Sequence, residues 1–376
     1  MTNRCITLIR YSTVFCLLIF FTGCGLFFNS HDDDNDRESI TLVFPGPMEL
    51  SIPEAISQDV PLVNGTDLPE GELITNEDLY QNLRAIVQTG ESPITVLEDL
   101  LSELRGVEIE NVVPAIGSLS SSYFSEKDGR RKDITLRQAP GLLFYDYLIT
   151  AVDEDKSQAA EIAWSVDPDR ILATIKPTNL DKTINPQWEN VFYRVEYSEE
   201  VASDYDDGTS ISITGLPQSS GLENLSMLLL RRAEEIDIFG SSYHPDFNLF
   251  DPSFSVGRNY NFIVRTNSTL NIGVAALSLP LSTEEGNDFL FDRFSVRLVF
   301  NEDLLTAGIN DPSIVDPLLD NATIPAYYIG EGGFVSSGAI VPVQEGFTEE
   351  FVNLDLLSFT FIPVDVKDMQ ILFLED

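Results

Sequence analysis

Residues 160–166 read AEIAWSV, with apolar side chains at the even positions and small or polar side chains at the odd positions. An alternation with a period of two is typical of a β-strand that buries one face. Residues 142–152 precede this segment across the charged turn 153–156, and apolar residues at 171, 173 and 175 follow it. The three segments together predict an antiparallel meander.

The same alternation continues toward the C-terminus. It recurs at residues 191–197, 211–213, 260–264, 270–274, 294–300 and 357–361. Sequential hairpins with one polar and one apolar face predict an antiparallel sheet, either curved, closed into a barrel or folded as a sandwich. We expect this β domain to span residues 136–376, with a break at 280–287 as the place where it would divide into two sheets.

Residues 222–238 are ambiguous. Residues 227–230 form an apolar block without a clear period, and residues 231–235 slightly favour a helix. The acidic loop Asp204–Gly208 alternates carboxylates as a calcium loop does, but its glycine comes one place early and no glutamate closes it. We expect a hairpin turn there, with Asp207-Gly208 as the turn pair.

Residues 40–135 are expected to hold an extended, proline-rich lead-in followed by two helices. The first helix has Thr75 as its N-cap and Gly90 as its stop; the second has Ser92 as its N-cap, Pro93 at its first position and Gly106 as its end. Their apolar residues form two stripes: Leu79, Leu83, Ile86 and Val87, then Ile94, Leu97, Leu100, Leu101 and Leu104. The sequence therefore predicts an N-terminal helical hairpin and a β-rich α+β fold.

The first 23 residues are typical of a secretory signal peptide, with basic Arg4 and Arg10 before the apolar run 11–21. The run ends in Phe21-Thr22-Gly23-Cys24, which resembles the lipobox of bacterial lipoproteins. The resemblance covers only these residues. It implies cleavage after Gly23 and acylation of Cys24, with a palmitate-type chain among those that hold the protein on the membrane.

The position after Cys24 is glycine rather than the aspartate that implies inner-membrane retention, so the resemblance favours the outer membrane of the cell envelope. The alternative is an uncleaved anchor, because residues 11–28 are nearly continuously apolar and about 18 such residues begin to span a bilayer. Gly23 and Gly25 disfavour such a helix.

Residues 24–39 form an acidic spacer whose composition is typical of a flexible segment. The three cysteines are Cys5, Cys16 and Cys24, so the mature chain has no internal disulfide. Removal of residues 1–23 takes away two arginines and no acids, which leaves 20 basic and 61 acidic residues and a net charge of −41. Such a charge disfavours nucleic-acid partners.

Catalytic signatures are weak throughout the chain. His244 is the one histidine outside the spacer, and its place before Pro245 favours a loop residue; no G-x-S-x-G motif occurs. The basic cluster 127–132 would suit an acidic partner or phosphate, but its Asp128-Gly129 turn favours solvated charges. Aromatic residues that would line a sugar or lipid cavity, or simply the core, are Trp164, Trp188, Tyr193 and Tyr197.

The sequence assigns no catalytic, metal-binding or cofactor-binding residue, and Cys24 and Gly23 are its only specific site residues. The expected function is that of a membrane-anchored envelope lipoprotein, a non-enzymatic binding or structural module with a protein or apolar-ligand partner. Two alternatives are a carrier or chaperone for lipids and a glycan hydrolase that uses two carboxylates. An open apolar cavity would favour the carrier, two facing acids the hydrolase, and a filled core a structural role.

Overall fold

The computed structural model describes residues 40–41, most of 44–63, 76–107, 112–113, 118–245 and 257–278 apart from short gaps, 295–301, 305–309, 326–329, 333–336 and parts of 351–374. All these elements belong to one compact unit, residues 38–376. The helices are α1 (Asn76–Gly106), α2 (Pro177–Leu180), and the single-turn 3-10 helices η2 (Pro186–Trp188) and η3 (Gln218–Ser220).

The strands in this part of the chain form two sheets. A two-stranded sheet pairs β1 (Ile40–Thr41) with β2 (Val112–Val113). The other sheet contains β3 (Ser118–Phe124), β4 (Arg131–Gln138), β5 (Tyr147–Asp153), β6 (Gln158–Val166), β7 (Asp169–Ile175), β8 (Phe192–Ser198), β9 (Asp207–Thr214), β10 (Asn224–Arg232), β11 (Glu235–His244), β12 (Arg258–Asn267), β13 (Ile272–Ser278), β14 (Ser295–Asn301), β15 (Leu305–Ile309), β16 (Ala326–Ile329) and β17 (Gly333–Ser336).

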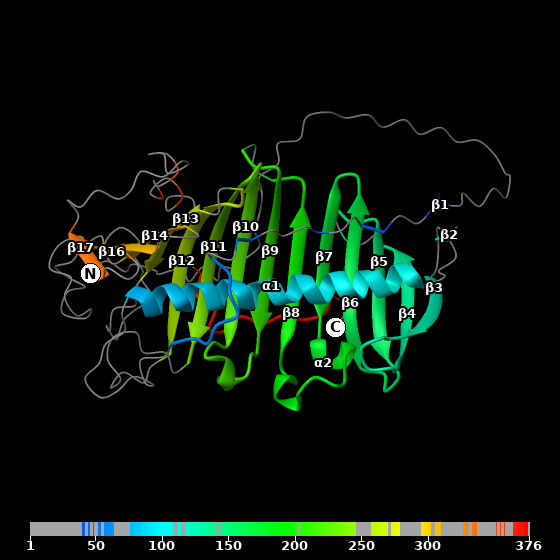
Figure 1. Ribbon diagram of the computed structural model, residues 1–376. Helices are drawn as coiled ribbons and strands as arrows, with labels where there is room; N and C mark the ends of the chain where they lie inside the picture. Colours follow the sequence, from blue (N-terminus) through cyan, green and yellow to red (C-terminus); the bar gives the residue numbers. More distant parts are fainter. Residues whose placement is uncertain are drawn as a thin grey trace, which may run out of the picture. The chain divides into compact units, whose positions relative to one another are not determined.

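Every strand of the large sheet pairs antiparallel with its neighbours in the chain, so the spatial order from β3 to β17 follows the sequence (Figure 1). The meander predicted from residues 142–175 corresponds to β5, β6 and β7, with Trp164 opposite both Tyr147 and Ile171. The antiparallel, β-rich prediction is confirmed. The sheet is open, because its two end strands, β3 and β17, do not pair with each other.

Helix α1 runs without interruption through residues 90–93, so the predicted helical hairpin is wrong. Gly90 lies where the helix meets β10: an added Cβ would lie 2.4 Å from Met227 Cε. The glycine therefore permits close approach rather than ending the helix. Pro93 lacks one backbone donor, but it is buried, and the apolar contacts of the helix on both sides of it offset this loss.

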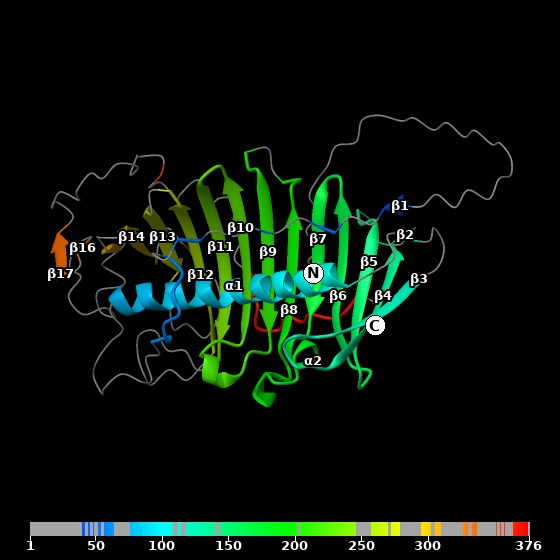
Figure 2. The ribbon, with the colours of Figure 1, turned by 45° about the vertical axis from the view of Figure 1, so that its right-hand side comes forward.

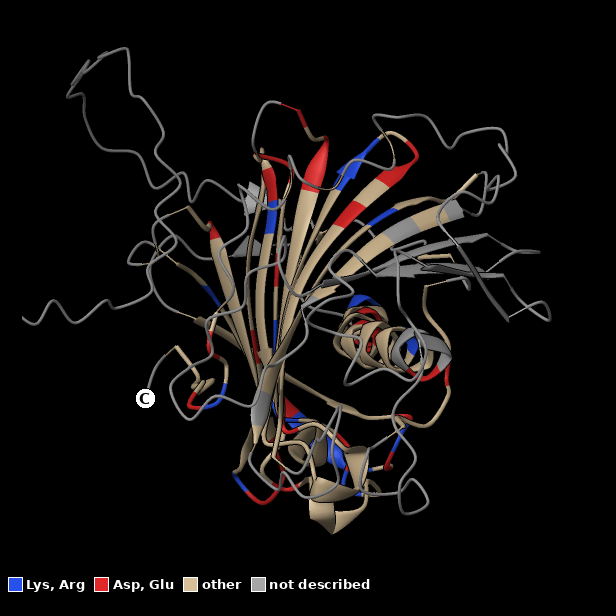
Figure 3. Cartoon of the chain, turned by 90° about the vertical axis from the view of Figure 1, so that its left-hand side faces the viewer, with Lys and Arg blue, Asp and Glu red and all other residues tan. Residues whose placement is uncertain are grey.

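Figures 1 and 2 show α1 crossing the strands, and Figure 3, which looks along the helix, shows it beside one face of the sheet. Its apolar stripe packs on the alternate residues that each strand turns to that face. Fully buried members of this core include Leu83, Val87, Leu97, Leu104, Trp164, Val195, Ile213 and Leu225. Burial of one aliphatic side chain stabilises the fold by about 1.5–3 kcal/mol, so the many buried side chains of this interface contribute strongly to stability.

The C-terminal segment covers part of the opposite face. Phe351, Leu354 and Leu357 pack against Phe239 and Ile263 from that side. Farther along, Asn224 donates to the carbonyls of Val366 and Lys367, both at 2.9 Å.

Coverage of both faces explains the apolar block 227–230, because Met227 and Leu229 face α1 while Leu228 and Leu230 contact the other cluster. Residues 231–235 are a hairpin end and not a helix, since β10 and β11 pair through Arg232 and Glu235.

The sheet starts before residue 136, because β3 precedes that point and β4 crosses it. Residues 280–287 lie outside the described residues, and the strands on either side of them, β13 and β14, pair with each other. The expected strand 270–274 begins at Ile272 as β13. Of the expected strand 357–361, only Leu357 is described, and it does not belong to a strand.

Candidate functional site: a polar groove beside helix α1

The residues that the sequence assigns to cleavage and lipid attachment, Gly23 and Cys24, lie outside the described residues, as do the signal peptide 1–23 and the spacer 24–39. Within the described part of the chain, no helix combines the length and apolar character that crossing a membrane requires. The described residues also contain no group of three His, Cys, Asp or Glu side chains that could hold a metal ion.

A groove of about 560 Å³ lies between the middle of α1, the segment 58–62, and the loops that carry η2 and η3. Its volume falls within the range of about 300–1,000 Å³ that is typical of small-molecule sites. Polar side chains make up much of the lining, including Gln58, Gln88, Gln218 and Ser219, and Trp188 contributes an aromatic ring. Asp59 is the only charged residue among the described residues that line the groove.

Side chains of α1 hold the first wall in place. Asn82, which is fully buried, accepts from the backbone nitrogen of Val63 at 2.6 Å and donates to the carbonyl of the same residue at 2.8 Å. Gln81 donates to the carbonyl of Pro61 at 2.6 Å, and Ser57 donates to Gln88 Oε1 at 2.9 Å. The extended segment is therefore fixed to the helix at both of its ends.

The opposite wall consists of two short helical turns. Asn185 caps η2 by accepting from the nitrogen of Gln187 at 3.1 Å, and the nitrogen of Trp188 donates to the Asn185 carbonyl at 2.9 Å. In η3, Gly221 is the C-cap with φ of 73°, a left-handed conformation that favours glycine. Leu62 from the first wall packs onto it, since an added Cβ on Gly221 would lie 3.0 Å from Leu62 Cδ1.

His244 stabilises this wall through a hydrogen bond to the C-cap residue of η3. Its Nδ1 lies 2.9 Å from the carbonyl oxygen of Gly221, and its Nε2 lies 2.8 Å from Ser242 Oγ. Because a carbonyl only accepts, Nδ1 carries the proton and Ser242 donates to Nε2. Both side chains are completely buried. The histidine thus lies at the end of β11 and positions η3, which corrects the expectation of a loop residue.

A serine bonded to a histidine whose other nitrogen is oriented by an acceptor is also the arrangement of a nucleophilic pair. Here neither Ser242 nor His244 is exposed, and neither lines the groove. Burial lowers the pKa of His244 to about 4, although the bond to Gly221 opposes the shift. The imidazole is therefore neutral at neutral pH, and its role in this structure is to hold a loop.

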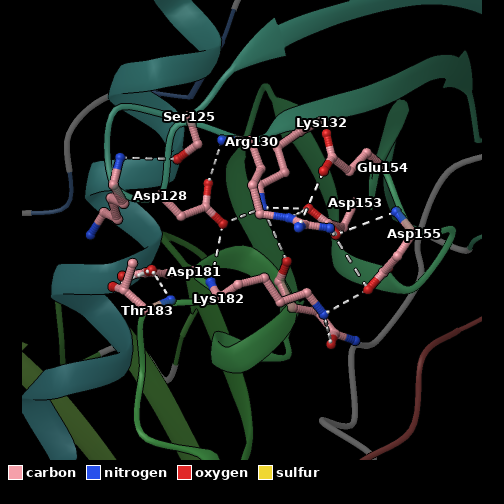
Figure 4. Close-up of polar contacts among 12 residues, drawn as sticks. Ser125, Asp128, Arg130, Lys132, Asp153, Glu154, Asp155, Asp181, Lys182 and Thr183 are labelled. Carbon is pink, nitrogen blue, oxygen red and sulfur yellow. Dashed lines mark hydrogen bonds and ion pairs between the residues drawn. The ribbon is translucent and has the colours of Figure 1, made fainter.

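Within the basic cluster 127–132, Lys132 and Arg130 join a network of ion pairs (Figure 4), whereas Lys127 and Arg131 are exposed, as expected of solvated charges. Lys132 is completely buried and donates to Asp128 Oδ2 at 2.8 Å, Asp153 Oδ1 at 2.7 Å and the carbonyl of Asn179 at 3.3 Å. Arg130 pairs with the other oxygen of Asp153 at 2.6 Å. The Asp128-Gly129 turn between β3 and β4 is present as predicted, with Gly129 at φ of 68°.

Electrostatics within the network favour the ionised carboxylates. Burial alone would raise the pKa of Asp153, but the hydrogen bonds from Arg130 and Lys132 outweigh burial and hold this pKa well below its ordinary value. The pKa of Asp128 is also lowered, because the donors Lys132 and Lys182 outweigh its desolvation. The network connects two hairpins with the region of α2, and its cations already have acceptors, so we interpret it as structural.

The other candidate residues divide between core and surface. Trp164 is fully buried, stacked with Phe44 at 5.7 Å between ring centroids, and Tyr193 is also buried, whereas Trp188 lines the groove. Asp207 and Gly208 belong to strand β9 rather than to the predicted turn, and Asp207 accepts from Arg231 Nε at 2.7 Å. The carboxylate of Asp207 is therefore engaged in a cross-strand ion pair.

Sequence reasoning identified one of the groove residues, Trp188, as a cavity candidate and missed the others. Gln58, Gln88 and Gln218 are ordinary polar residues of three separate segments, and no local spacing connects them. Comparison of the chain with protein families, with curated proteins and with solved structures finds no match.

Proposed function

We propose that the protein is a lipid-anchored envelope lipoprotein that serves as a non-enzymatic binding module. The observation that supports a binding role is the preformed groove, whose walls are held by hydrogen bonds to buried groups such as Asn82 and His244. A rigid site loses little conformational entropy when a ligand binds. The anchor follows from the lipobox resemblance at Cys24, with the outer membrane as the favoured location.

The packing of α1 favours this role over that of a lipid carrier. Its residues Leu83, Leu97 and Leu104 have no exposed surface, because they pack against the apolar face of the sheet. A carrier of this architecture would use that face for its ligand. Among the described residues, the face is occupied by the protein's own helix.

The groove chemistry also favours binding over glycan hydrolysis. Hydrolysis of a glycosidic bond requires two carboxyl groups at about 5–10 Å from each other. The described lining of the groove offers one, Asp59. A binding module requires no second acid.

Metabolic labelling with an alkyne analogue of palmitate tests the anchor. We expect label on the wild-type protein and none on Cys24→Ala, together with loss of membrane retention in the variant. Intact mass distinguishes the alternative of an uncleaved helix, which would retain residues 1–23. Equal labelling of both proteins, or absence of label from the wild type, would contradict the lipoprotein proposal.

A further inference from the structure

We infer that the groove beside α1 binds a neutral saccharide, most simply a segment of an envelope or external glycan. This inference rests on the proposed binding function and specifies its ligand. It follows from three properties of the groove: its aromatic ring, its uncharged polar side chains and its single carboxylate.

The aromatic ring is provided by Trp188, which is partly exposed and lies on η2 at the edge of the groove. A pyranose ring has an apolar face of C–H groups and a periphery of hydroxyls. Trp188 is partly packed against the core, and the exposed part of its indole provides apolar surface for the C–H face of the sugar. The hydroxyls at the periphery of the sugar require hydrogen-bonding partners around the ring.

Such partners line the rest of the groove. Side-chain amides of Gln58, Gln88 and Gln218 both donate and accept, as sugar hydroxyls do. Asp59 lies on the exposed segment and accepts only, so its bonds to hydroxyls would be charge-assisted and stronger than neutral ones. The lining thus matches a ligand with many hydroxyls and no negative charge.

Other ligand classes match less well. An anion would meet Asp59 and no cation among the described lining residues, within a chain of net charge −39. A lipid tail would exclude water from a lining that exposes polar side chains such as Gln58 and Ser219. An extended peptide typically adds to a free strand edge, whereas these walls are a helix, an extended segment tied to it and two 3-10 turns.

The two tryptophans of the chain provide a direct test. Trp164 is completely buried and Trp188 lines the groove, so a change in fluorescence on binding reports on Trp188. Full-length protein is purified in a zwitterionic detergent that has no sugar head group. It is titrated with maltotetraose, cellotetraose and chitotetraose, while calorimetry measures affinity independently of fluorescence.

We expect saturable binding of at least one tetrasaccharide, with a fluorescence change that disappears in Trp188→Phe. Trp188→Ala and Asp59→Asn should each weaken binding roughly tenfold or more, because they remove the stacking surface and the charged acceptor. Phe124→Ala is the matched control: it truncates an exposed aromatic ring on β3, outside the groove, and should bind as the wild type does. Circular dichroism and urea midpoints verify that each variant is folded.

Absence of binding for all three tetrasaccharides at about 10 mM would overturn the inference. So would binding that Trp188→Ala and Asp59→Asn leave unchanged, or a Trp188-dependent response to inorganic phosphate or tetraglycine in place of the saccharides. Palmitate labelling of the same preparation keeps the two proposals distinct. A labelled protein that binds no saccharide refutes the ligand assignment alone, whereas an unlabelled wild type refutes the anchor.

Discussion

The buried ammonium of Lys132 offers the sharpest test of how the sheet is held together. Lys132→Met keeps most of the side-chain volume and removes the charge that lies between Asp128 and Asp153. These carboxylates are 1% and 0% exposed, so water cannot replace the lost donor. Asp153 would retain Arg130, and Asp128 would retain backbone donors, but the charge of the network would no longer be balanced.

The magnitude follows from this burial. Removal of one partner from a buried ion pair costs about 3–5 kcal/mol, chiefly because the remaining charge is desolvated without compensation. The free energy of unfolding of a typical domain is about 5–15 kcal/mol. Loss of Lys132 should therefore remove a large part of the stability of the sheet.

Urea denaturation followed by circular dichroism at pH 7 measures this loss of stability. The slope of the free energy of unfolding against urea concentration should stay close to that of the wild type. Lys127→Met is the matched control, because Lys127 pairs with Asp99 at 2.6 Å while both side chains are substantially exposed. An exposed pair is worth about 1 kcal/mol or less. Combining Lys132→Met with Asp128→Asn should cost less than the sum of the single changes, by about 0.5–3 kcal/mol.

A Lys132→Met cost below about 1 kcal/mol, equal to that of Lys127→Met, would refute the interpretation of the network as a buried structural element. Strict additivity of the double variant would show that Lys132 and Asp128 are not coupled.

Acidification gives a second prediction: because burial lowers the pKa of His244 to about 4 from 6.5, the unfolded chain binds a proton before the folded one does as the pH falls. Stability from this group is complete above pH 6.5 and declines toward pH 4, by roughly 2–3 kcal/mol, and urea titrations should show a smaller decline for His244→Gln. A third prediction concerns Gly90→Val, which crowds the flexible end of Met227 and should cost about 1 kcal/mol, the low end for overpacking. Gly106→Val, where no atom lies within 4 Å of an added Cβ, should change the thermal midpoint much less, and equal shifts would contradict the close-approach role of Gly90.

Local pattern accounts for the parts of the fold that were predicted correctly. Alternation at 160–166 predicts a strand, because successive side chains of an extended backbone point to opposite faces. The expectation that only one face is buried is wrong, since all residues from 159 to 165 are buried and Ala163 packs in a different cluster from Trp164. The helix was divided wrongly because Gly90 and Pro93 were given their usual local meaning. A signal in the sequence favoured one helix: the apolar positions 83, 87, 94, 97, 101 and 104 stay in phase across both residues.

The groove was less accessible to sequence reasoning. Groove residues such as Gln58 and Gln218 lie 160 positions apart, and they meet because buried groups fix separate loops to the same helix and sheet. His244 illustrates the same limitation, since its next neighbour Pro245 indicates a loop while its burial depends on Gly221 and Ser242.

The sequence by itself determined the strand periodicity, the apolar stripe of α1, the acidic charge and the lipobox-like segment ending at Cys24. The patterns depend on residues close together in the chain, and the charge depends on composition alone. Tertiary structure alone decided that the helix is continuous, that Lys132 and His244 are buried, and that Trp188 lies on a groove. Burial and hydrogen bonding at those positions depend on partners from distant segments, whose positions relative to each other only the folded chain determines.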